Sequence, residues 1–141
     1  MINFSCLNLT LAPLSISQLL IALLLAICFL QSGFDKIIDY KGNLCWLKEH
    51  FKSSMLKNLV PFLLTTITVF ELVGGFLCLV GIFDFFINGT KMLLFYGFFI
   101  NAISLISLFL GQRLAKDYDG AAVLIGYFIL TIIGILSFSF I

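Results

Sequence analysis

The 141-residue sequence carries little charge, since only 11% of its residues are Asp, Glu, Lys or Arg, against about 25% in soluble domains. It has one histidine, His50, which excludes a bis-histidine haem and a histidine-rich metal site. None of Cys6, Cys28, Cys45 and Cys78 forms a Cys-x-x-Cys pair, so a thiol redox motif and a haem attachment sequence are also excluded. We therefore expect no metal site and no covalently bound cofactor. The formal net charge of +1 gives no indication of nucleic-acid binding.

Charge is wholly absent from residues 1–32. A signal peptide has a basic start followed by about 7–15 apolar residues, and the first apolar run here is longer than that. We therefore expect this run to be a retained membrane span.

Apolar residues make up 62% of the chain, and seventeen of them are Phe. They gather in four segments, each of the length that a membrane-spanning helix needs. Backbone groups in lipid must be satisfied within the segment, and the strands of a membrane barrel are about ten residues long, so these segments are helices. Short connections make neighbouring helices antiparallel. The sequence thus predicts an all-α polytopic membrane protein, a single transmembrane domain with an antiparallel four-helix bundle, spanning residues 11–31, 60–83, 92–110 and 121–141.

The first connection is long and holds five of the eight basic residues. Its apolar residues recur at helical spacing, its lysines occupy other positions, and Trp46 is typical of a membrane interface. This pattern predicts an amphipathic helix on the membrane surface over residues 44–58, with Asn43 as its cap. A plain solvated loop is the alternative. The apolar positions are Leu44, Leu47, Phe51 and Met55.

The basic residues also predict the orientation. The first and third connections carry seven of them, whereas the rest of the chain carries only Lys91. Because basic residues favour the cytoplasmic side, we expect a multi-pass protein of the inner (cytoplasmic) membrane of a bacterium, with these two connections in the cytoplasm and both termini outside.

Glu71 stands alone inside the second apolar segment. A carboxylate at the centre of a bilayer costs roughly 2.5–3.5 kcal/mol on insertion scales, so the residue must be paired, protonated or used. Asn101 on the third segment lies at about the same depth, about 15 Å from the helix end. We expect the two side chains to meet, with Ser104, Tyr127 and Thr131 as further donors.

Three interpretations of Glu71 stay open. A neutral Glu71 bonded to Asn101 can hold the bundle together without further function. The same polar side chains can form a pocket for a small lipophilic ligand such as a quinone headgroup. Proton transfer is the third interpretation, although a proton path usually needs a chain of titratable groups.

Charged residues also cluster at the ends of the first and third segments, where we expect an interfacial ion-pair network. Its members are Lys36, Arg113, Lys116 and Asp117. The other lysines of the first connection fit topology anchoring. We expect glycines to let the helices approach closely, at Gly74 and Gly75 above all.

Three sequence elements resemble the DoxX family of small four-helix membrane proteins, and the resemblance extends over nearly the whole chain. They are Ser32-Gly33-Phe34-Asp35-Lys36, Glu71-Leu72-Val73-Gly74-Gly75 continuing to Gly81, and Arg113-Leu114-Ala115-Lys116-Asp117 continuing to Ala122. The resemblance implies a four-helix bundle and a link to membrane redox work, since founding relatives include a small subunit of a thiosulfate:quinone oxidoreductase. The residues of this chain that match the family's motifs are Gly33, Lys36, Glu71, Gly75, Gly81, Arg113 and Asp117. The family often has an Arg early in its first helix, where this chain has Gln18.

Together these features favour a small accessory subunit that docks on a larger membrane protein complex, embedded in the lipid bilayer, with no catalytic residue assigned. A quinone-reactive oxidoreductase subunit is the alternative function. A conduit for protons or small solutes is a third.

Overall fold

The computed structural model describes residues 12–139, which form five helices and no strand. Four helices are long and apolar enough to cross a membrane: α2 (Pro13–Ile38), α4 (Val60–Asn88), α5 (Met92–Leu114) and α6 (Tyr118–Ser137). The fifth, α3 (Tyr40–His50), is followed by the turn-rich segment 51–59. The predicted all-helical, polytopic membrane fold is therefore confirmed.

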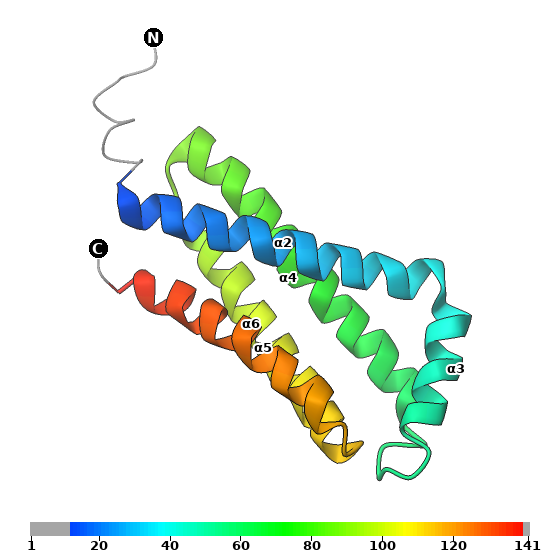
Figure 1. The fold of residues 1–141 in the computed structure, drawn as a ribbon. Coiled ribbons are helices and arrows are strands. Elements are labelled where there is room, and N and C mark those ends of the chain that lie inside the picture. Colours follow the sequence, from blue (N-terminus) through cyan, green and yellow to red (C-terminus); the bar gives the residue numbers. More distant parts are fainter. Residues whose placement is uncertain (1–11, 140–141) are drawn as a thin grey trace.

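The bundle has two distinct ends (Figure 1). One, here called the terminal end, holds the start of α2, the finish of α6 and the connection between α4 and α5. The other, here called the α3 end, holds α3, segment 51–59 and the connection between α5 and α6. α4 packs mainly against α2 and α5, while α6 packs mainly against α5. α2 and α4 cross and then diverge toward the α3 end, where α3 bridges them.

The helix boundaries have local causes. Pro13 and Pro61 occupy the first and second positions of their helices, where the missing N–H costs nothing. Gly89 ends α4 with a φ of 73°, a left-handed conformation that glycine adopts without strain. The Asp117 side chain caps α6 by accepting a 2.9 Å hydrogen bond from the Gly120 N–H.

Several helix boundaries differ from the sequence-based prediction. α4 runs to Asn88 and α5 to Leu114, past the predicted ends at 83 and 110, and α6 begins at Tyr118, before the predicted start at 121. Two further differences affect the site. α2 does not stop near residue 31 but continues to Ile38, so Ser32 and Lys36 are helical. The helix expected over residues 44–58 instead spans Tyr40–His50, because Asp39 rather than Asn43 caps it by accepting from the Gly42 N–H at 3.1 Å. It ends early because the chain turns locally: the Ser54 hydroxyl, for example, accepts from the Leu56 N–H at 3.2 Å.

The core joins α2, α4 and α5, with Leu25, Cys78 and Phe98 fully buried. At the terminal end, the backbones of α4 and α5 lie so close that a side chain between them would clash. A Cβ on Gly81 would lie 2.8 Å from the Leu94 nitrogen, and one on Gly97 would lie 2.9 Å from the Cys78 nitrogen. These two helices therefore come into close contact where glycine permits it.

Candidate functional site

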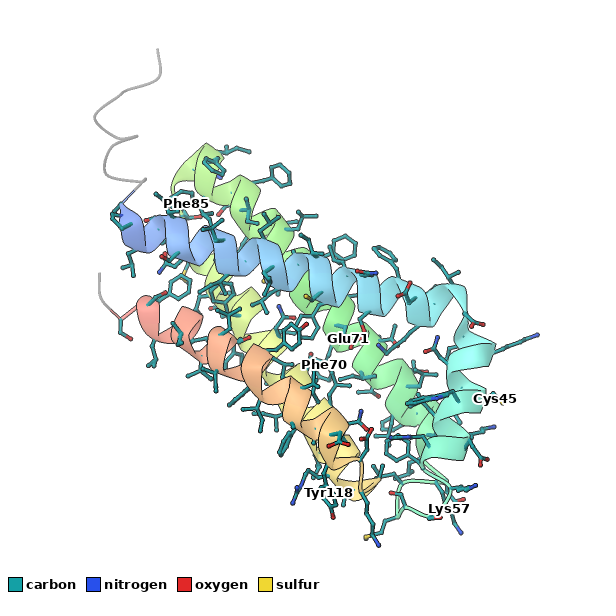
Figure 2. The ribbon with its side chains drawn as sticks, viewed as in Figure 1. Cys45, Lys57, Phe70, Glu71, Phe85 and Tyr118 are labelled. Atoms are coloured by element: carbon teal, nitrogen blue, oxygen red, sulfur yellow. The ribbon has the colours of Figure 1, made fainter. Side chains whose placement is uncertain are left out.

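Three polar side chains meet where α2 crosses α4. Ser32 and Lys36 stand four residues apart on α2 and so share one face of the helix. Glu71 points toward that face from α4 and is only 1% exposed. Figure 2 shows Glu71 part-way along α4, between Phe85 near the terminal end and Lys57 at the α3 end.

Lys36 and Glu71 form an ion pair. The Lys36 Nζ atom lies 2.9 Å from Glu71 Oε2, and the Ser32 hydroxyl donates to Glu71 Oε1 at 3.2 Å. Lys36 Nζ also donates to the Ser32 hydroxyl at 2.5 Å and to the Ser32 carbonyl at 3.3 Å. Although the ammonium is close, Oε2 receives no well-aligned hydrogen bond. The pair thus neutralises the buried carboxylate while leaving one of its oxygens incompletely satisfied.

The burial of the pair is uneven. The Glu71 side chain is 2% exposed and the Lys36 side chain 16%. A lysine near a helix end ordinarily extends toward water, but this one reaches toward the bundle interior instead. A buried ion pair adds little net stability, yet removing one partner typically costs 3–5 kcal/mol because a buried charge is left unpaired. The geometry therefore makes each partner depend on the other.

The expected bond between Glu71 and Asn101 does not form. Asn101 is fully buried, but its Nδ2 donates to the Cys78 Sγ at 3.4 Å, and its Oδ1 has no hydrogen-bond partner. Oδ1 lies against Gly74, where a side chain would displace it. The rotation of α4 turns Glu71 toward α2 and leaves Gly74 and Cys78 facing Asn101 on α5. The extension of α2 to Ile38 supplies the ammonium that the sequence-based prediction placed in an interfacial network.

That interfacial network is also different from the one expected. Lys36 pairs with Glu71 instead. The Arg113 guanidinium lies over the Tyr118 ring, 4.5 Å from its centroid. Asp117 faces His50, with 3.7 Å between Oδ2 and Nε2. Lys116 has a φ of 60° in the turn between α5 and α6. The predicted ion pairing among Lys36, Arg113 and Asp117 is therefore wrong.

His50 makes structural contacts that the sequence-based prediction missed. Its Nε2 lies 2.9 Å from the Gln112 Oε1, and its ring stacks on Trp46 with centroids 4.6 Å apart. These contacts tie the end of α3 to the end of α5. The four-residue spacing of Trp46 and His50 on a helical pattern is the one sequence signal that could have indicated the stacking.

A cavity of about 310 Å³ lies between α4 and α5 at the α3 end. α3 and segment 51–59 close one side of it through Leu47, Phe51 and Leu56, and its lining is almost entirely apolar. Among residues 12–139, Lys36 is the one charged residue that lines it. The ion pair and the cavity therefore form one site, with the ammonium between the carboxylate and the apolar space.

A protein-family model described as DoxX matches residues 17–106, more than half of the chain. The chain is a member of the DoxX family. No curated protein and no solved structure matches it. The resemblance read from the sequence is confirmed, and the matched range includes Ser32, Lys36 and Glu71, whereas the element at residues 113–122 lies beyond it.

In this DoxX protein the other expected donors do not join Glu71. The Ser104 hydroxyl donates to the Ile100 carbonyl at 3.0 Å, and the Thr131 hydroxyl donates to the Tyr127 carbonyl at 2.8 Å. Tyr127 itself is 39% exposed on α6. Each hydroxyl thus bonds within its own helix, and none adds to the polar group around the carboxylate.

Three of the glycines predicted to let the helices approach, Gly33, Gly75 and Gly81, lie at helix contacts in this DoxX protein. Side chains added at Gly33 and Gly75 would meet Leu72 and Leu30 where α2 crosses α4, and one at Gly81 would meet α5. The close crossing at Gly33 and Gly75 brings the α2 face that carries Ser32 and Lys36 up to Glu71. Within residues 12–139, no group of three or more His, Cys, Asp or Glu residues is arranged to hold a metal ion.

At the terminal end, a second buried polar group lies between α2 and α6. Gln18 is fully buried and donates to the Ser137 hydroxyl at 2.9 Å, and that hydroxyl donates to the Gly134 carbonyl at 2.5 Å. Lys91 donates to the Ser15 hydroxyl at 2.9 Å nearby, and its partial burial lowers its pKa. No carboxylate takes part in these hydrogen bonds.

Proposed function

We propose that this DoxX protein is a small accessory subunit of a larger inner-membrane complex, which it stabilises by docking and not by catalysis of its own. The observation that carries this proposal is the outward face of α6. This α6 face is made of Ala122, Ile125, Gly126, Ile129, Ile133 and Leu136, and all six residues are exposed.

The α6 face has the features of a helix-packing surface. α6 is the least covered of the four spanning helices, with 22% of its apolar window buried against 33–39% for the others. Ala122 and Gly126 are four residues apart, and a Cβ on Gly126 would meet nothing within 4 Å. Lipid tails are as apolar as side chains, so helices associate in membranes by close packing, which small residues permit.

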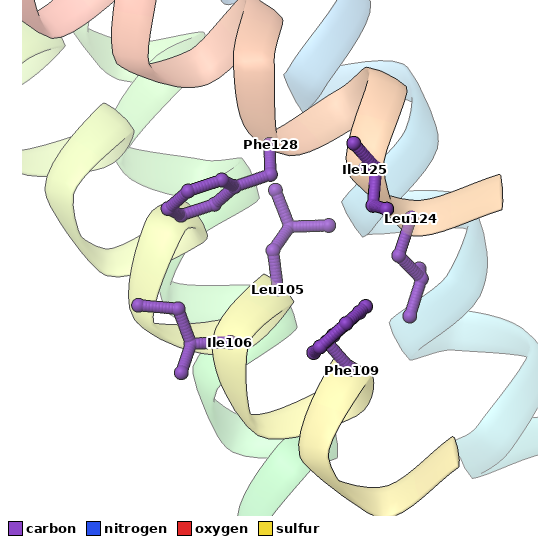
Figure 3. Close-up of a pocket in the computed structure, with 6 residues that line it drawn as sticks. All are labelled: Leu105, Ile106, Phe109, Leu124, Ile125 and Phe128. Carbon is purple, nitrogen blue, oxygen red and sulfur yellow. The ribbon is translucent and has the colours of Figure 1, made fainter. Parts of the chain in front are cut away.

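A shallow apolar groove adjoins this face. It measures about 170 Å³ and lies between α5 and α6, as Figure 3 shows. Its walls are Leu105, Ile106, Phe109, Leu124, Ile125 and Phe128. Ile125 belongs to both the groove and the α6 face, so a partner helix packed on α6 can insert side chains into the groove. The partner is therefore expected to be a transmembrane helix of a larger protein.

The remaining features support a structural role in a bacterial inner membrane. The Lys36–Glu71 pair is satisfied mainly within the chain, which suits a residue that fixes the crossing of α2 and α4. The basic residues at the α3 end favour a cytoplasmic location for that end, with both termini outside. The family resemblance is the reason to place the partner complex in redox metabolism.

Affinity purification from native membranes tests the docking role. We expect wild-type protein to recover a larger membrane assembly and Gly126→Leu to recover roughly tenfold less, since helix contacts of this kind contribute about 1–2 kcal/mol. Val123→Leu is the matched control, because Val123 is exposed on the same helix outside the α6 face. A wild-type protein that purifies alone, or equal recovery with Gly126→Leu, contradicts the proposal.

A quinone-reactive subunit is the second candidate. The observation that favours it is the Lys36 ammonium in the wall of an apolar cavity, where it can donate to a quinone carbonyl. Glu71→Gln removes the charge of the carboxylate while keeping its shape. Loss of quinone-linked turnover in an intact complex supports this candidate, whereas turnover that falls only in step with a loss of assembly favours the structural role.

A further inference from the structure

The cavity at the α3 end has an apolar interior and a basic margin. Inside, the hydroxyls of Thr66 and Ser107 already donate to carbonyls of their own helices, at 2.9 Å in each case. The Lys36 charge is balanced by Glu71. The interior is therefore electrically neutral and suited to a hydrocarbon chain.

The margin has the opposite character. Four of the apolar lining residues have a basic residue directly beside them in sequence, in the pairs Leu47–Lys48, Phe51–Lys52, Leu56–Lys57 and Arg113–Leu114. Lys52 pairs with Glu49. Among residues 12–139, Lys48, Lys57 and Arg113 have no ion pair with an acidic side chain. The segments that line the cavity thus also carry three basic residues without an acidic partner, each directly beside a lining residue in the sequence.

α3 holds the cavity closed on this side. The His50–Gln112 contact fastens the end of α3 to α5, and the Phe51 ring comes next to it in sequence as part of the lining. A Cβ on Gly111 would lie 3.6 Å from the Phe51 ring, so α5 and this segment are in ordinary contact. The lining and the basic margin are therefore held in a fixed relation to each other.

We propose that this cavity binds an anionic phospholipid from the surrounding leaflet, with an acyl chain in the cavity and the phosphate among Lys48, Lys57 and Arg113. The acyl chain fills the cavity but adds little selectivity, since the bilayer interior is equally apolar. The basic residues contribute selectivity for an anionic head group, and each is expected to favour it by about fivefold. This proposal is independent of docking through α6.

Native mass spectrometry tests the proposal. The full chain is reconstituted in vesicles of equal phosphatidylglycerol and phosphatidylcholine and then released. We expect one retained phospholipid per chain, with phosphatidylglycerol favoured over phosphatidylcholine by roughly a hundredfold. Lys57→Gln with Arg113→Gln changes only exposed side chains and is expected to lower that preference by about fivefold per residue.

A second pair of variants locates the lipid. Ser107→Phe fills the cavity and should abolish retention, whereas Ile106→Phe, one residue away in the α5–α6 groove, should leave it unchanged. Equal retention of the two phospholipids by the wild type overturns the proposal. So does retention that survives Ser107→Phe in a folded protein, or a quinone or free fatty acid as the bound species.

Discussion

The two ends of the bundle bury polar side chains by different means. Toward the α3 end, α2 and α4 share a charged pair, Lys36 and Glu71, beside an apolar cavity. At the terminal end, α2 and α6 share a neutral pair, Gln18 and Ser137, in a closely packed region. Loss of one member of a buried charged pair lowers stability strongly, whereas loss of one member of a neutral amide–hydroxyl pair lowers it much less. The comparison therefore predicts that the bundle is most sensitive near its open end.

The largest expected effect is that of Lys36→Met. It leaves Glu71 buried without a counter-ion and should lower the free energy of unfolding by about 3–5 kcal/mol, measured by unfolding of purified protein in mixed detergent. The double variant Lys36→Met with Glu71→Leu should recover most of this loss, because an apolar pair of similar volume replaces the charges. A single variant as stable as the wild type contradicts the pairing.

The next-largest effect compares two glycines, one in a close contact between helices and one in an ordinary contact. Gly81→Ala places a Cβ 2.8 Å from the α5 backbone and should cost about 1–3 kcal/mol by overpacking. Gly111→Ala, whose Cβ would make an ordinary contact with the Phe51 ring at 3.6 Å, should be neutral or stabilising by up to about 1 kcal/mol through helix propensity. Thermal denaturation of the two variants side by side measures the difference. Equal losses would mean that α5 packs as tightly against Phe51 as it does against α4 at Gly81.

His50→Ala should have a smaller and local effect. Loss of its contacts with Gln112 and Trp46 removes about 1 kcal/mol, and the change should be confined to α3 and segment 51–59. Hydrogen exchange followed by mass spectrometry should show faster exchange in this region, with the core of α4 unchanged. Unchanged protection of segment 51–59 would show that other contacts hold it in place.

The smallest effect is expected for Gln18→Met. Ser137 keeps its hydrogen bond to the Gly134 carbonyl, and the unpartnered Gln18 Oε1 is removed, so we expect a change of less than about 1 kcal/mol. The same unfolding assay measures it. A loss as large as that of Lys36→Met would erase the difference between the two ends.

Apolar runs alone located the four spanning helices. The thickness of the bilayer sets their length, and the need to hydrogen-bond every backbone group in lipid leaves few structures other than helices. The apolar runs did not locate the end of α2, since Ser32 to Ile38 mixes polar and apolar residues that continue the helix by packing against α4. The partner of Glu71 was missed for the same reason. Depth follows from counting residues, but the direction in which Glu71 and Asn101 point depends on helix rotation and crossing, which one sequence does not specify.

The ionisation state of Glu71 tests the account most directly. An infrared difference spectrum between the wild-type protein and Glu71→Gln, recorded at neutral pH in lipid, isolates the absorption of this one side chain. Pairing with Lys36 predicts the loss of a carboxylate stretching band in the variant. Loss of the carbonyl band of a protonated carboxylic acid instead would show a neutral Glu71 and contradict the ion pair.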